Sequence, residues 1–72
     1  MDSKTVSVAL KGVTKAVEKH FESKKEEARV RYVLYTTQPL AVGDHSNVVE
    51  EAIKSLEDYE HAQSCLDLLS RL

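Results

Sequence analysis

The feature that most limits the fold of this chain is that its 72 residues include a single cysteine. One cysteine cannot form an intrachain disulfide, and no Cys/His cluster has the spacing of a structural zinc site. A chain this short buries only about 60% of the surface that it exposes when unfolded, so its core is small. Small domains without such cross-links are often stabilised by a partner chain. The sequence therefore predicts one small domain, residues 1–72, that associates with another chain.

The composition is that of a globular domain rather than a disordered segment, with 42% hydrophobic and 31% charged residues. The longest apolar run covers only residues 32–35, so the sequence predicts no membrane-spanning helix. The first residues lack the apolar core of a signal peptide. We therefore expect an intracellular protein, cytoplasmic or nuclear and not secreted.

Charge divides the chain into a basic half and an acidic half. Residues 1–36 carry a net charge of +3 and residues 37–72 a net charge of −5. This asymmetry predicts either self-association in which the two halves meet or two surfaces for different partners. The alternative is that two exposed helix faces simply differ in sign.

The acidic half predicts a long helix from residue 47 to residue 72. Its apolar residues recur at steps of three and four, and Asn47 with Glu50 resembles a capping box. The last turns are apolar on two sides, which is more apolar surface than one packing partner can bury. We expect a protein interface there, in a homodimer. Its predicted residues are Cys65, Leu68, Leu69 and Leu72.

The first part of the chain permits two interpretations. Apolar residues at helical spacing favour one helix over about residues 4–26, with Gly12 as its weakest point. The alternation of Val6, Val8 and Leu10 would also suit a strand over residues 5–10. The helix explains more positions and is the preferred interpretation.

Residues 29–37 predict a strand, because β-branched and aromatic residues dominate this segment. We expect Val30, Tyr32 and Leu34 in the core and Arg29 and Arg31 facing solvent. Pro39 ends the segment, and residues 40–42 suit a second short strand. The predicted fold is thus α+β: helix, short β-ribbon, long C-terminal helix. If residues 5–10 form a strand, the order becomes β-α-β-β-α.

No constellation of residues predicts catalysis. Asp44, His45 and Ser46 carry the groups of a hydrolase triad, but adjacent residues in a turn cannot align nucleophile, base and orienting group. His61 and Cys65 are four apart on the expected helix and lack further metal ligands. We expect no enzyme activity, no cofactor, no metal and no small-molecule substrate.

A basic set predicts nucleic-acid binding as the alternative function. Lysines at positions 4, 11, 15 and 19 form one stripe on the expected first helix, and the predicted strand adds arginines and a tyrosine. The acidic isoelectric point near 5.9 argues against this function. The candidate residues are Lys11, Lys15, Lys19, Arg29, Arg31 and Tyr35.

An acidic face on the C-terminal helix predicts a protein partner. Its residues are Glu50, Glu57, Asp58 and Glu60. Such a face suits a basic partner surface. The preferred expectation is therefore a non-enzymatic interaction or regulatory module, a homodimer whose further partner is a protein rather than nucleic acid or a membrane.

Overall fold

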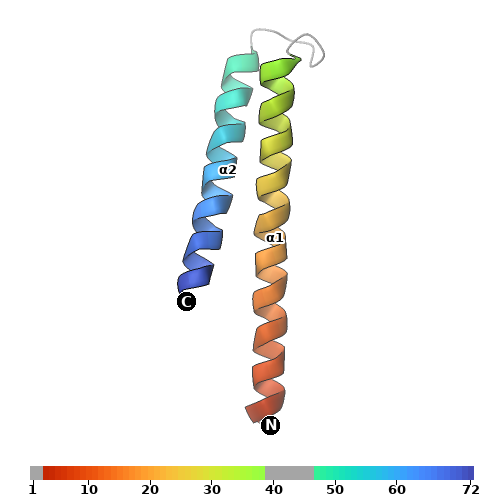
Figure 1. Cartoon of the computed structure of the whole chain (residues 1–72), viewed down its shortest axis with the longest axis vertical. Coiled ribbons are helices and arrows are strands. Elements are labelled where there is room, and N and C mark those ends of the chain that lie inside the picture. The colour runs from red at the N-terminus through yellow and green to blue at the C-terminus, as the bar shows by residue number, and fades with distance from the viewer. Residues whose placement is uncertain (1–2, 39–46) are drawn as a thin grey trace.

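Two α-helices account for nearly all of the described chain. The computed structural model describes residues 3–38 and 47–72, with α1 spanning Ser3–Thr37 and α2 spanning Val48–Arg71. The helices lie side by side and run in opposite directions (Figure 1). The radius of gyration is 17.3 Å, against roughly 11 Å for a compact domain of this length. The protein is an elongated helical hairpin.

The α+β prediction is wrong, because the described residues contain helices and no strand. Residues 29–37, expected as a strand, form the last part of α1, and residues 5–10 are helical as well. The first helix therefore continues well past residue 26. The expected strand at residues 40–42 lies outside the described residues. The prediction of a long C-terminal helix is confirmed by α2.

The end of α1 shows why residues 29–37 are helical despite their β-forming side chains. A strand needs a neighbouring strand for its backbone hydrogen bonds, whereas a helix makes these bonds within itself. The hydroxyl of Thr37 donates to the carbonyl of Val33 at 2.6 Å. The backbone N–H of Gln38 donates to the carbonyl of Leu34 at 2.9 Å. The helix ends just before Pro39, which disfavours helical backbone in the residue preceding it.

The two helices meet through small side chains. Ala28 of α1 and Ser55 and Ala62 of α2 are almost completely inaccessible to solvent. The Ser55 hydroxyl donates to the carbonyl of Glu51 at 2.9 Å, so burial leaves no unsatisfied hydrogen bond there. Ser55 and Ala62 are seven residues apart, which places them on the same side of α2. Small residues at these positions let the helix backbones approach closely.

The predicted core residues are on the surface instead. Val30, Tyr32 and Leu34 are 51%, 37% and 38% exposed. Their alternate spacing would align them on one face of a strand, but residues two apart on a helix point in widely different directions. The prediction of these three side chains as core is therefore wrong.

Much apolar surface remains outside the contact between the helices. The large hydrophobic side chains that are exposed are Leu10, Val13, Val17, Val30, Tyr32, Val33, Leu34, Val49, Ile53, Leu56, Leu68 and Leu72. Contiguous exposed apolar surface marks interaction sites in proteins. Among the described residues, neither helix is long and apolar enough to cross a membrane.

The start of α2 differs in one detail from the expected capping box. Asn47 occupies the N-cap position, but its side chain makes no capping hydrogen bond. Its φ and ψ angles of −102° and −1° are helical, whereas a capping side chain is usually carried by an extended residue. Glu50 and Glu51 lie in the first turn, where the positive end of the helix dipole favours them.

Candidate functional site

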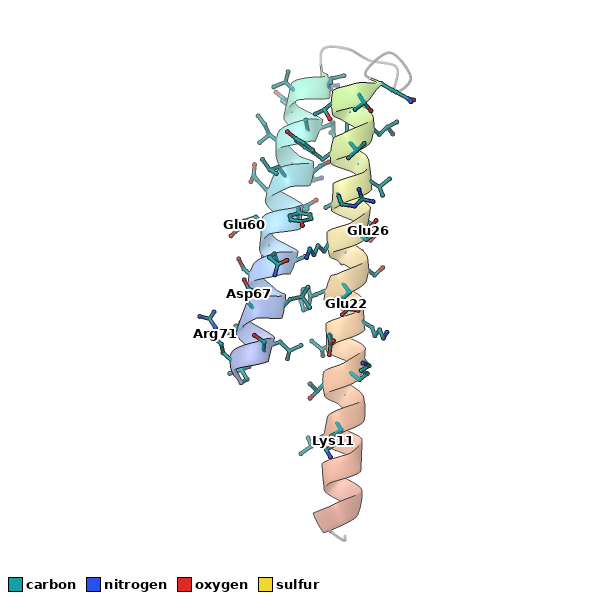
Figure 2. All side chains as sticks on the ribbon, viewed as in Figure 1. Lys11, Glu22, Glu26, Glu60, Asp67 and Arg71 are labelled. Carbon is teal, nitrogen blue, oxygen red and sulfur yellow. The ribbon has the colours of Figure 1, made fainter. Side chains whose placement is uncertain are left out.

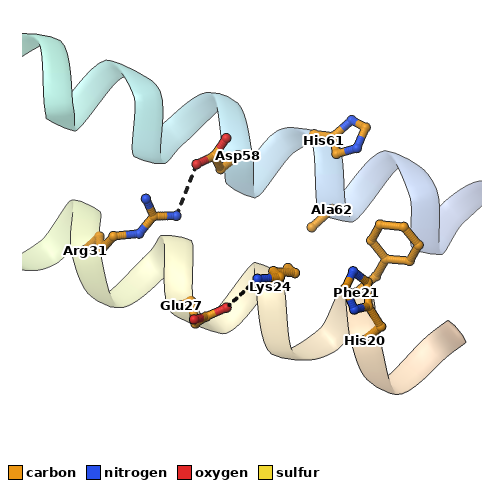
Figure 3. A pocket seen from close by; sticks show the side chains of 8 residues that line it. All are labelled: His20, Phe21, Lys24, Glu27, Arg31, Asp58, His61 and Ala62. Carbon is orange, nitrogen blue, oxygen red and sulfur yellow. Dashed lines mark hydrogen bonds and ion pairs between the residues drawn. The ribbon is translucent and has the colours of Figure 1, made fainter. Parts of the chain in front are cut away.

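A groove lined by charged and aromatic side chains runs along one side of the two helices, with a volume of about 590 Å³. Figure 3 shows side chains from both helices converging on it. The lining residues are His20, Phe21, Lys24, Glu27, Arg31, Asp58, His61 and Ala62.

Two ion pairs lie in this groove. Arg31 of α1 donates from Nη2 to Oδ2 of Asp58 on α2 at 3.1 Å, which connects the helices. Lys24 Nζ lies 3.5 Å from Glu27 Oε2 within α1. All four side chains are substantially exposed, so each pair contributes at most about 1 kcal/mol. The pairs also neutralise the charges that a charged ligand would require.

Aromatic rings lie at the end of the groove near the chain termini. Phe21 packs edge-on against His20, with ring centroids 5.0 Å apart, and against His61 of α2 at 6.4 Å. On another side of the hairpin, Lys25 Nζ lies 5.4 Å from the ring centroid of Tyr59. The Phe21–His61 and Lys25–Tyr59 contacts join the two helices.

His61 and Cys65 come close enough to interact, with Nε2 and Sγ 3.8 Å apart. A nucleophilic thiol also needs hydrogen-bond donors that stabilise the developing oxyanion. Backbone N–H groups within α2 already donate to the carbonyls four residues earlier, so the helix around Cys65 supplies no such donors. Within the described residues, no group of three or more possible ligands could hold a metal ion. The set Asp44, His45 and Ser46 lies outside the described residues.

The predicted nucleic-acid-binding set is divided between different sides of the hairpin. Arg29 and Arg31 were expected on one strand face, but residues two apart on a helix point in widely different directions. Arg31 is paired with Asp58, and Arg29 Nη2 lies 2.6 Å from Glu26 Oε1. Tyr35 is half-buried. Only the row of Lys11, Lys15 and Lys19 remains together, exposed on α1.

The Glu26–Arg29 pair has a consequence for titration. Hydrogen bonds from Arg29, with its positive charge, hold the pKa of Glu26 below its ordinary value of 4.5. The same hydrogen bonds and the charge of Glu26 raise the pKa of Arg29. A lowered carboxyl pKa means that the pair stabilises the helix at neutral pH and is lost only as the pH falls through that lowered pKa. The Arg29 guanidinium is therefore occupied at neutral pH.

The predicted interface residues at the end of α2 fall into two groups. Leu69 is half-buried in a groove shared with Thr14 and Glu18 of α1, so it packs within its own chain. Leu68 and Leu72 are 53% and 93% exposed. Cys65 is half-buried between these groups.

The predicted acidic face is nearly intact. Glu50, Glu57 and Glu60 are exposed on α2, and Figure 2 shows Glu60 on the side away from α1. Asp58 is separate from them, since it lies in the groove and pairs with Arg31.

The sequence interpretation missed a group of apolar residues on the first part of α1. Leu10, Val13 and Val17 have the helical spacing that favoured the first helix, and they are 61%, 61% and 38% exposed. The exposure follows from the lengths of the helices, since α1 has 35 residues and α2 has only 24. Once residues 29–37 are known to be helical, α1 is too long for α2 to cover.

The fold and groove place the protein in the general class of antiparallel helical hairpins. Comparison of the chain with protein-family models, with curated proteins and with solved structures finds no match in any of the three. The function must therefore be argued from the surface of the hairpin itself.

Proposed function

We propose that this protein is a non-enzymatic interaction or regulatory module that works as a homodimer. The observation that carries this proposal is the imbalance between buried and exposed apolar surface. In the described residues the fully buried side chains are Ala28, Ser55 and Ala62, whereas twelve large hydrophobic side chains are exposed.

The imbalance matters because the hairpin has little to stabilise it alone. A buried methyl or methylene group contributes about 0.8 kcal/mol, and ordering the backbone of one residue costs about 1–2 kcal/mol. The three fully buried small side chains, with half-buried ones such as Phe21 and Leu66, offset little of the cost of ordering two long helices. A second chain that covers the exposed side chains would supply the missing burial. An intracellular location belongs to this proposal, since a reducing compartment keeps the Cys65 thiol free.

The outer face of α2 suits a further partner of opposite charge. Glu50, Glu57 and Glu60 are exposed there, and a basic protein surface would complement them. Figure 2 shows Glu60 on the side of α2 away from α1.

Self-association is tested by sedimentation equilibrium at micromolar concentration under reducing conditions, so that Cys65 cannot link chains covalently. We expect a dimer of the 8.1 kDa chain. Because only the folded chain dimerises, the melting temperature should also rise with protein concentration. A monomer whose melting temperature is independent of concentration would contradict the proposal.

Nucleic-acid binding is a second candidate, favoured by the row of Lys11, Lys15 and Lys19. Three phosphate contacts predict an affinity that falls with salt with a log–log slope of about −2 to −3. Replacing the three lysines with glutamine should abolish that binding, whereas Lys24→Gln, which removes a lysine already paired with Glu27, should not. No retention on nucleic acid at low salt would exclude this function and leave the homodimer proposal standing.

A further inference from the structure

The first part of α1 has an apolar side and a basic side. Leu10, Val13 and Val17 are exposed and follow one another at steps of three and four, which places them on one side of the helix. Half a helical turn corresponds to about 1.8 residues, so a residue two positions from both Val13 and Val17 lies nearly opposite them. That residue is Lys15. We call residues 3–20 the amphipathic segment of α1.

The basic side is a row of three exposed lysines. Lys11, Lys15 and Lys19 are four residues apart and therefore neighbours along the helix. Within the described residues, none of the three belongs to an ion pair of the hairpin. The sequence of the segment contains four lysines and one glutamate, a net charge of +3. The positive charge of the row is thus not neutralised by the helices of the hairpin.

The amphipathic segment projects beyond the end of α2. Leu66, Leu69 and Ser70 of α2 share a groove with Thr14 of α1, and α1 continues beyond this point (Figure 1). Figure 2 shows Lys11 on the projecting part. This part, residues 3–13, is about 16 Å long at 1.5 Å for each residue. A surface that docks on the segment meets no obstacle from α2 there.

The end of α2 widens the apolar side. Along α1, a step of three leads from Val17 to His20, which lines the groove. Along α2, steps of four and three lead from His61, which also lines the groove, through Cys65 to Leu68. Leu68 is exposed and lies on the same side of the hairpin as Val17. The two helices therefore present apolar side chains in one direction.

The combination of the two sides indicates what covers the apolar row. A helix that is apolar on one side and rich in lysine on the other is the type that lies in the surface of an anionic bilayer. The lysines remain in water, yet the helix is only about 10–12 Å across and the Debye length is about 8 Å at physiological salt. Long lysine side chains also bend toward the headgroups. A nucleic acid would contact the lysine row alone and leave the apolar row in water.

We propose that the amphipathic segment of α1, together with Leu68 of α2, docks in the surface of an anionic lipid bilayer. The segment lies parallel to the bilayer with its apolar row among the headgroups. This inference goes beyond the interaction module proposed above and does not depend on the homodimer, because exposed apolar residues such as Val30, Ile53 and Leu56 lie outside this surface. The sequence did not predict it, because the exposure of the apolar row was not known.

The first test is binding to vesicles of phosphatidylcholine and phosphatidylserine in a ratio of about two to one. Sedimentation of the vesicles with the bound protein gives the partition constant. We expect binding that weakens as salt is added, because the lysine row acts through its charge. Binding to vesicles of phosphatidylcholine alone should be weaker by about tenfold or more.

The decisive variant removes the apolar side and keeps every lysine. Val13→Ser with Val17→Ser should lower the partition constant by about tenfold or more. The matched control is Val30→Ser with Val33→Ser, the same change at two valines of similar exposure on the same helix. The control should bind as the wild type does. Circular dichroism establishes that each variant is helical before its binding is measured.

Three results would overturn the inference. The first is a wild-type chain that does not sediment with the mixed vesicles; if that chain retains a single-stranded oligonucleotide, the lysine row belongs to a nucleic-acid site instead. The second is undiminished binding by the Val13 and Val17 variant, which would show attraction by charge alone. The third is an equal loss in both valine variants, which would show that the amphipathic segment has no special part in binding.

Discussion

Replacing Ala62 with leucine is expected to lower the melting temperature of the hairpin sharply. Ala62 is 1% exposed, on the side of α2 that packs against α1 near Phe21 and Lys24. A larger side chain there forces the backbones apart or adopts a strained rotamer, at a cost of about 1–3 kcal/mol. In a domain of this size each kcal/mol lowers the melting temperature by about 4–8 °C. Thermal unfolding followed by circular dichroism measures the change.

The matched control for this substitution is Ala16→Leu on α1. Ala16 is exposed, and leucine is nearly as good a helix former as alanine, so stability should change little. If Ala62→Leu melted at the wild-type temperature, the helices would not meet through Ala62, and the packing of small residues would be wrong.

Replacing Val33 with proline is expected to unfold the C-terminal part of α1 and to destabilise the hairpin. Proline removes a backbone donor and clashes with the preceding turn, which costs about 3 kcal/mol or more inside a helix. Val33 lies within α1, four residues before its end. We expect a large loss of the helical circular-dichroism signal at 222 nm and a large fall in melting temperature.

Val33→Ala is the companion to this substitution and separates helix from strand. Val33 is 44% exposed, so little packing is lost, and alanine has the higher helix propensity. Helical signal should be retained or slightly increased. In a strand the same change would remove a favourable β-branched residue and lower stability. An unchanged helical signal in Val33→Pro would show that this segment is not helical in solution.

For the candidate site residues, the sequence predicted only those features that depend on positions close together in the chain. Leu68 and Leu72 were expected at an interface; both are exposed, and the interface itself stays a prediction. Leu69 was grouped with them, yet it packs against α1, because the sequence did not show where α1 lies. The arginines were assigned to one face because alternation in a strand aligns them, and the helical backbone separates them.

The exposure of the apolar residues in the first part of α1 could not have been predicted by periodicity alone. Leu10, Val13 and Val17 have the spacing of a buried stripe. Whether a stripe is buried depends on how far the neighbouring helix extends. The structure shows that α2 ends near Thr14, and this decides that part of the stripe faces solvent.

The sequence by itself determined the local features of this protein. Helical periodicity predicted α2, Pro39 predicted the end of the preceding element, and the count of charges predicted a basic first half and an acidic second half. Each of these features depends on residues close together in the chain. They follow from backbone sterics, from side-chain spacing and from the addition of charges.

Tertiary structure alone decided the state of residues 29–37 and the identity of the core. Strand propensity is realised only where another strand supplies a ladder, and the described residues contain no such strand. The segment therefore extends α1, which satisfies its own backbone hydrogen bonds. The core then forms where Ala28, Ser55 and Ala62 are small enough for two helices to approach. Most of the large apolar side chains stay on the surface, because a two-helix hairpin has only one inner side.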